Sequence, residues 1–229
     1  MDIRFLGHSA FALTHEATTV LVDPFLTGNP RAAADAAEVE ADAILVTHAH
    51  ADHLGDTVDI ARRTGATVVA SVELAGEIGA ELGDGHDVRD PNIGGTVDFD
   101  WGTVRLTPAW HTSTSPSGAV SIATGMVIEL GGARTYHLGD TGLFSDLALP
   151  RRREHLDVAL IPIGGHYTMD RFDAVVAAEL VGADTVIPMH YDTFPPVQTD
   201  VQAYKRDVER AGFAQVVVLE PGGTYALRP

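Results

Sequence analysis

The sequence contains no cysteine, a single lysine and no long apolar run. Without cysteine, disulfide bonds and thiolate metal ligands are excluded. No stretch is long and apolar enough to cross a bilayer, so no membrane partner is expected. Residues 1–7 resemble a folded strand rather than a signal peptide, which predicts a cytoplasmic location. The length of 229 residues is enough for one sizeable domain, and we predict a single domain over residues 1–229.

The charge balance is strongly acidic. The formal net charge is −17, aspartate outnumbers glutamate by 21 to 11, and Lys205 stands beside 14 arginines. Such a surface is expected of a protein kept soluble in concentrated salt, although a GC-rich genome that favours arginine would give a similar composition. A net negative field repels polyanions. The one basic cluster, residues 151–153, has no interleaved aromatic residues and is interpreted as a solvated loop, so nucleic acid is not an expected partner.

Hydrophobic patterning predicts two similar halves, each with a block of strands followed by alternating strands and helices. The predicted strands are residues 2–6, 10–14, 18–23, 43–46, 66–70, 96–99, 102–109, 120–130, 133–138, 157–161, 184–188 and 215–219. The predicted helices are a short one within residues 29–41, then 54–65, 72–82, 170–182 and 199–211. Two sheets packed face to face, with helices outside, would accommodate this order.

The residue types that bind metals are densest at His48, His50, Asp52 and His53. The group follows the apolar run of residues 43–46, which has the pattern of a buried strand. His48 and His50 are two residues apart, so in extended chain they point to the same side. Imidazole and carboxylate are ligands of zinc and similar divalent metals. Four such groups within six residues favour half of each of two adjacent metal sites over a polar turn that only caps a helix.

Three further candidate ligands follow predicted strands in the second half of the chain: His111, Asp140 and His190. Alone, a histidine or aspartate at a strand end is more often a satisfied polar residue. Sheet proteins build their sites at one end of several strands, so recurrence at strand ends predicts that these side chains converge.

Other polar residues at strand ends and turns have less specific interpretations. Asp23 is a candidate acceptor for the free N–H of a ligand histidine, or a turn-forming Asp-Pro residue. His8 either lines the pocket and contacts substrate or is a buried structural histidine. His166, on a glycine-rich turn, is a candidate donor to the substrate. Residues 112–114 either contact substrate or form a polar loop.

The order His-x-His-x-Asp-His, then His111, then Gly-Asp-Thr at 139–141, then His190 resembles the metallo-β-lactamase superfamily. The likeness is nearer to one branch, the metal-dependent hydrolases related to ascorbate-6-phosphate lactonase. That branch is indicated by Asp-Pro-Phe at 23–25, Gly-Asp-Thr-Gly-Leu-Phe at 139–144 and Met-His-Tyr-Asp-Thr-Phe-Pro at 189–195. The resemblance covers nearly the whole chain. It implies an α/β fold, the four-layer αββα sandwich of two mixed sheets with helices on the outer faces.

The same resemblance implies a role for each candidate ligand. The first metal would be held by His48, His50 and His111. The second would be held by Asp52, His53 and His190. Asp140 would bridge the two, and Asp52 would also orient the nucleophile and carry its proton. The implied cofactors are two divalent metal ions, zinc in the first place, with manganese, iron or nickel as alternatives.

We therefore predict a metal-dependent hydrolase that uses a metal-bound hydroxide at a dinuclear site. Its partner would be a small-molecule substrate: an ester, lactone, amide or phosphoester. A nuclease or phosphodiesterase of the same fold is one alternative, but the sequence offers no basic groove for it. A non-catalytic metal-binding protein is the other. Assembly into a homo-oligomer is compatible with the sequence.

We expect the unfolding midpoint to be higher in molar potassium chloride than in low salt, because screening relieves repulsion within the acidic surface. Thermal unfolding followed by circular dichroism at both salt concentrations measures this. Equal midpoints would leave the salt-adapted interpretation without support.

Overall fold

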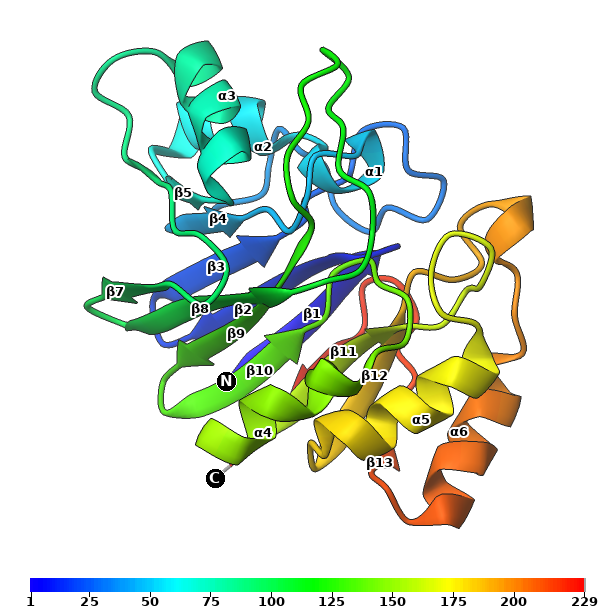
Figure 1. The fold of residues 1–229 in the computed structure, drawn as a ribbon. Helices are drawn as coiled ribbons and strands as arrows, with labels where there is room; N and C mark the ends of the chain where they lie inside the picture. The colour runs from blue at the N-terminus through cyan, green and yellow to red at the C-terminus, as the bar shows by residue number, and fades with distance from the viewer. Residues whose placement is uncertain (229) are drawn as a thin grey trace.

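The computed structural model describes residues 1–228 and forms two seven-stranded mixed sheets (Figure 1). The first sheet has the order β14-β1-β2-β3-β4-β5-β6. Its strands β1 to β3 are antiparallel, and β4, β5 and β6 continue from β3 in parallel. The bounds are β1 Asp2–Gly7, β2 Ala10–His15, β3 Thr18–Val22, β4 Ala43–Leu45, β5 Thr67–Val69, β6 Val88–Arg89 and β14 Thr224–Ala226.

The second sheet repeats this plan. Its order is β13-β12-β11-β10-β9-β8-β7, with β7 to β10 antiparallel and β10 to β13 parallel. The two predicted halves are therefore both present. The bounds are β7 Thr96–Phe99, β8 Gly102–Pro108, β9 Thr124–Leu130, β10 Ala133–His137, β11 Val158–Pro162, β12 Thr185–Met189 and β13 Gln215–Val216.

Helices cover the outer face of each sheet (Figure 1). Over the first sheet lie α1 Ala51–Leu54, α2 Thr57–Thr64 and α3 Val72–Leu82. Over the second lie α4 Leu149–Arg153, α5 Arg171–Val181 and α6 Val201–Ala211, with 3-10 turns η1 Ser145–Ala148 and η2 Pro195–Val197 nearby in the chain. The predicted αββα sandwich is confirmed. No helix within residues 1–228 is long and apolar enough to cross a membrane.

Three apolar clusters hold these layers together. Phe11 and Leu13 of the first sheet pack between the sheets with Leu106 and Leu160 of the second. A second cluster lies under α2 and α3, and a third under α5 and α6. Each fully buried leucine or phenylalanine contributes roughly 1.5–3 kcal/mol relative to an exposed one. The predicted helix starts are also present, with the carboxylates of Asp170 and Asp200 accepting backbone N–H groups at the first turns of α5 and α6.

Two predicted helices differ from the observed structure. Residues 29–41 form turns without a helix, because the Asp35 carboxylate accepts the Ala37 N–H and so competes with helical hydrogen bonding. The helix predicted over residues 54–65 begins only at Thr57, as α2, and an unpredicted short helix, α1, precedes it over residues 51–54. At the break, Gly55 has φ +45° and the Asp56 carboxylate accepts N–H groups from residues 26 and 27.

Other boundaries also moved. The basic residues 151–153, predicted to form a solvated loop, are the last turn of α4. The strand predicted over residues 120–130 begins only at Thr124, and the strand predicted over 215–219 ends at Val216. The short strands β6 and β14 were not predicted, because two or three residues give too little alternation to recognise.

Six strands run in matching directions and deliver polar side chains to one edge of the sandwich. Within the first sheet β1, β3 and β4 point the same way, and within the second β8, β10 and β12 do so. The carboxyl ends of these strands lead into the candidate site residues His8, Asp23, His48, His111, Asp140 and His190.

The two sheets approach closely where Gly139 meets Thr47 and Thr124. Gly139 has φ +64°, and a Cβ added there would lie 2.4 Å from the Thr124 carbonyl oxygen and 3.2 Å from the Thr47 Cβ. The Thr124 N–H and hydroxyl both donate to the Thr47 carbonyl, at 3.0 and 2.9 Å. Only glycine fits here, directly before the candidate ligand Asp140.

We expect Gly139→Ala to destabilise the protein by about 2–4 kcal/mol, from left-handed strain plus the clash with Thr124. Gly65→Ala is the matched control, since Gly65 has φ +77° with nothing within 4 Å of an added Cβ. The free energy of unfolding of Gly65→Ala should fall by only about 1–2 kcal/mol. Urea denaturation of both variants measures the difference, and equal losses would contradict the close-approach argument.

Candidate metal centre

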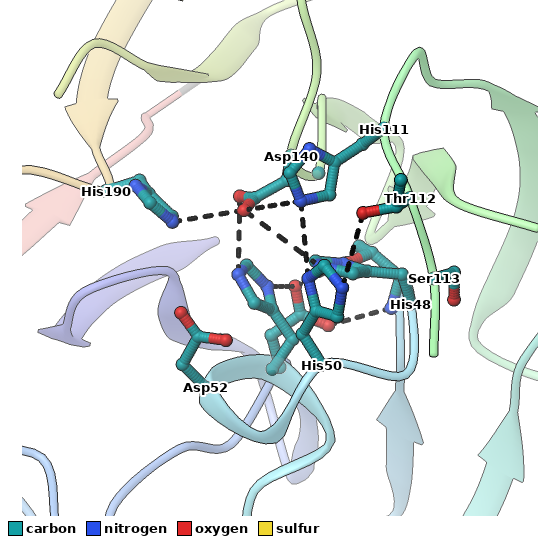
Figure 2. A network of polar contacts seen from close by, with 12 residues as sticks. His48, His50, Asp52, His111, Thr112, Ser113, Asp140 and His190 are labelled. Carbon is teal, nitrogen blue, oxygen red and sulfur yellow. Dashed lines mark hydrogen bonds and ion pairs between the residues drawn. The ribbon is translucent and has the colours of Figure 1, made fainter. Parts of the chain in front are cut away.

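All seven predicted ligand side chains converge at the edge described above. They come from the loops that follow β4, β8, β10 and β12, and Figure 2 shows most of them pointing toward one another. The set is His48, His50, Asp52, His53, His111, Asp140 and His190. Residues up to 142 positions apart, from 48 to 190 in the chain, therefore form one cluster.

Three histidines form the first group. His48 Nε2 lies 3.1 Å from His50 Nδ1, and His111 Nε2 lies 3.3 Å from the same Nδ1. The ligand atoms of these three residues all lie within 4.8 Å of one another. Three imidazole nitrogens in this arrangement suit a tetrahedral metal site that keeps a fourth position open.

Asp52, His53 and His190 form the second group, and their ligand atoms can lie within 4.8 Å of one another. Asp140 stands between the two groups. Its Oδ2 is 3.0 Å from His190 Nε2 and 3.6 Å from His111 Nε2, while its Oδ1 is 3.3 Å from His53 Nε2. One carboxylate therefore faces nitrogens from both groups, which is the placement that the resemblance implied for a bridging ligand.

Two facing atoms in this cluster show that it fits a cation. His53 Nε2 and Asp140 Oδ1 are buried and have no hydrogen-bond partner, although they lie 3.3 Å apart. Leaving a buried polar atom unpaired costs about 1–3 kcal/mol. A divalent metal between them would satisfy both atoms at once. Nitrogen and carboxylate oxygen are also ligands of zinc.

The buried ionisable groups of the centre shift one another's pKa values. Burial raises the pKa of Asp140, but His190 and His53 outweigh burial and hold that pKa well below its usual range. Burial lowers the pKa of His53, but Asp140 and Asp23 outweigh it and hold the pKa well above 6.5. Burial and the neighbouring His53 lower the pKa of His48 well below 6.5.

Asp23 fixes the orientation of two ligand rings from below. It is fully buried, and its Oδ2 accepts both the His53 Nδ1–H at 2.7 Å and the Thr47 hydroxyl at 2.7 Å. Because the Thr47 hydroxyl proton goes to Asp23, its oxygen accepts from His48 Nδ1, 3.1 Å away. Both rings therefore turn their Nε2 atoms toward the centre. The acceptor role predicted for Asp23 agrees with this geometry, whereas no sequence pattern marked Thr47.

His8 contacts a ligand rather than the cavity. It is 1% exposed, and its Nε2 lies 3.1 Å from Asp52 Oδ2 while its Nδ1 lies 2.9 Å from the Thr193 hydroxyl. Burial lowers the pKa of His8 to about 4, so the ring is neutral at pH 7. A neutral ring donates from Nε2 to Asp52 and accepts from Thr193. Burial opposes ionisation of Asp52, but the His8 hydrogen bond and the neighbouring His53 together outweigh burial and hold the pKa of Asp52 below its usual range.

Backbone strain concentrates around this centre. His8, Asp23 and His190 each follow a strand directly and adopt left-handed backbone angles, with φ of +60°, +46° and +55°. Such angles in residues other than glycine cost about 1–3 kcal/mol and persist where surrounding contacts hold them. Here the His190 N–H donates to the His8 carbonyl at 2.8 Å, which joins two of these positions.

The remaining polar candidates have different surroundings. His166 is exposed, does not line the cavity, and packs edge-on against Tyr167 with ring centroids 4.4 Å apart. Thr112 lines the cavity, and its hydroxyl lies 3.5 Å from His50 Nε2. Ser113 is buried and accepts the Ala49 N–H at 3.0 Å, so it holds the ligand loop in place.

A cavity of about 650 Å³ opens above the ligands. Apart from ligand residues and Thr112, its lining is apolar or aromatic: Phe25, Ala51, Tyr167, Phe194 and Pro196. The sequence did not predict these lining residues, because an aromatic residue in a loop carries no pattern that separates a cavity wall from ordinary packing.

The chain is similar to known proteins over nearly its whole length. The model of the beta-lactamase superfamily domain matches residues 2–190. A metal-dependent hydrolase of Symbiobacterium thermophilum is 47% identical, with 99% of this chain and 100% of that protein covered. A metal-dependent hydrolase of Thermus thermophilus is 44% identical, with 99% of both covered. The solved structure of a metallo hydrolase from Ignicoccus hospitalis has a TM-score of 0.88 and 37% identity, with 99% of both chains covered.

We expect Asp23→Asn to weaken metal binding by about 10–100-fold, the usual effect of losing a partner that orients a ligand. Asparagine can keep the Thr47 N–H bond through its oxygen, but its NH₂ group cannot accept from His53. Chelator competition on the purified protein measures the affinity. Asp170→Asn is the control, since it also removes one aspartate and asparagine caps a helix equally well. Unchanged affinity in Asp23→Asn would contradict the orienting role.

Proposed function

The chain belongs to the metallo-β-lactamase superfamily, and from this premise we propose that it is a metal-dependent hydrolase of a small-molecule ester, lactone, amide or phosphoester. The observation that carries the proposal is the buried pair His53 Nε2 and Asp140 Oδ1, unpartnered between two groups of metal ligands. The relatives named above as metal-dependent hydrolases support the reaction class.

We assign two divalent ions to the centre, with zinc as the first candidate for its nitrogen-rich ligand set. His48, His50 and His111 would hold one ion, and Asp52, His53 and His190 the other, with Asp140 shared. When bound, such a pair of ions lowers the pKa of a water molecule and polarises the oxygen of the group under attack. Asp23, Thr47 and His8 keep the ligand side chains in the orientation that this requires.

Asp52 is the residue to which we assign proton transfer. Its side chain is 33% exposed and lines the cavity, whereas the Asp140 side chain is only 3% exposed. His8 contacts Asp52 Oδ2 at 3.1 Å and so fixes the orientation of the carboxylate at the cavity. An ionised, positioned carboxylate at the cavity can accept a proton from the attacking water and pass it to the leaving group.

The two alternative functions have less support from the site. Among the described residues, none that lines the cavity is lysine or arginine, so a nucleic-acid backbone would find no cationic contact there. A metal-binding protein without catalysis would not need the cavity of about 650 Å³ that opens at the ligands. The experiment below distinguishes catalysis from metal binding.

We expect Asp52→Ala to retain its fold and at least one metal ion, because the three histidines of the first group remain. Hydrolysis of an activated ester or phosphodiester should fall at least about 100-fold, the lower range for losing a positioned acid–base group. Asp140→Ala should bind metal more weakly than Asp52→Ala, since both ions lose a ligand.

Elemental analysis after gentle purification measures the metal content, which should be about two metals per chain in the parent protein. Initial rates on the same samples measure hydrolysis. Near-parental turnover by Asp52→Ala on every substrate that the parent hydrolyses would show that the assigned proton transfer is wrong. Full metal content without any hydrolysis by the parent would favour the non-catalytic alternative.

A further inference from the structure

We propose that the substrate is an uncharged molecule with an apolar acyl or aromatic group next to the scissile bond, and that Phe194, Phe25 and Tyr167 select it. This inference rests on the proposed hydrolase function and narrows its substrate class. It favours esters, lactones or amides over phosphorylated compounds.

Three separate loops build an aromatic wall beside the ligands. Phe25 follows β3, Tyr167 follows β11, and Phe194 with Pro196 follows β12. The rings of Phe25 and Phe194 lie with centroids 6.4 Å apart, and Phe194 also packs edge-on against His8 at 5.5 Å. Tyr167 is 54% exposed, so it has free surface to offer to a bound molecule. The wall is therefore anchored to the centre at one end and open at the other.

Among the described residues, the cavity offers an anionic substituent no cationic side chain beyond the ligands, and its other polar side chains are Thr112 and Tyr167. No described lining residue is lysine or arginine, the side chains that bind phosphate and carboxylate most strongly. Cations near the chain termini and α6 are paired elsewhere, as Arg31 with Glu220 at 3.2 Å and Lys205 with Glu209 at 3.0 Å. The N-terminal turn of α1 could attract an anion, but Asp52 already occupies it.

The scissile group has to lie at the ligands, so the rest of the substrate meets the aromatic wall. Each methylene group buried there should raise affinity about threefold to fourfold. A carboxylate or phosphate at the same place would lose its hydration without gaining a partner, which is unfavourable. The cavity of about 650 Å³ has room for an acyl group of several carbons.

The test compares hydroxamates with one chelating head group and different tails, so that only the tail meets the wall. The ligands are acetohydroxamate, hexanohydroxamate and adipic monohydroxamate, in which a carboxylate replaces the terminal methyl group of the hexano chain. We expect hexanohydroxamate to bind the metal-loaded protein at least about 30-fold more tightly than acetohydroxamate by calorimetry, from four additional methylenes. Adipic monohydroxamate should gain no such advantage. Equal or tighter binding of the adipic compound would overturn the inference.

Substitutions in the aromatic wall test whether its side chains cause the preference for hexanohydroxamate. Phe194→Ala should reduce the hexano advantage, the ratio of hexanohydroxamate to acetohydroxamate affinity, at least about fivefold, because apolar contact area is lost. Tyr167→Ala, at an exposed position that the fold does not depend on, should act in the same direction. Phe172→Ala is the control, since this ring on α5 is 61% exposed and does not line the cavity. Unchanged selectivity in both wall variants would contradict their role.

Hydrolysis rates distinguish this inference from the proposed function. The metal-loaded protein is given 4-nitrophenyl hexanoate, mono-4-nitrophenyl adipate and 4-nitrophenyl phosphate, and the hexanoate should have the highest kcat/KM. A faster rate on the phosphate would overturn the substrate class and leave the hydrolase assignment standing. Hydroxamate selectivity without hydrolysis of any ester, lactone, amide or phosphoester would contradict the proposed function, while the wall's preference would stand.

Discussion

The structure depends on one buried carboxylate, that of Asp140, held among histidines from both halves of the chain. It faces His53 from the first sheet's loops and His111 and His190 from the second's, at 3.0 to 3.6 Å. An unpaired buried charge would cost several kcal/mol. This edge of the sandwich is therefore stable only when histidines of the surrounding segments, protons or metal ions compensate the charge of Asp140.

This requirement explains features around the centre that packing alone would not produce. Strained left-handed angles at His8, Asp23 and His190 turn each loop inward directly after its strand. Gly139 allows the two sheets to touch immediately before Asp140. Stability is given up at these positions, and the three apolar clusters of the layers offset it.

Side-chain hydrogen bonds to the backbone explain where the structure departs from the predicted helices. The helix predicted over residues 54–65 begins three residues late, at Thr57, because the Asp56 carboxylate accepts the N–H groups of residues 26 and 27. This contact fixes the loop that carries Phe25 of the cavity wall. The same loop presents Phe25 to the cavity and Asp23 to the ligand rings. Hydrogen bonds between distant segments leave no local pattern, so a single sequence could not reveal them.

The sequence by itself determined the two-halved αββα sandwich, through alternating apolar residues, and the seven candidate ligands, through residue types at strand ends. Those features depend on near neighbours in the chain, which a sequence displays directly. Only the tertiary structure decided that His8 holds Asp52, that Thr47 links Asp23 to His48, and that His166 lies away from the cavity. It also decided that the cavity wall is aromatic and lacks cationic side chains among the described residues. These relations join residues up to 185 positions apart, as in the His8–Thr193 contact, so they exist only once the sheets have packed.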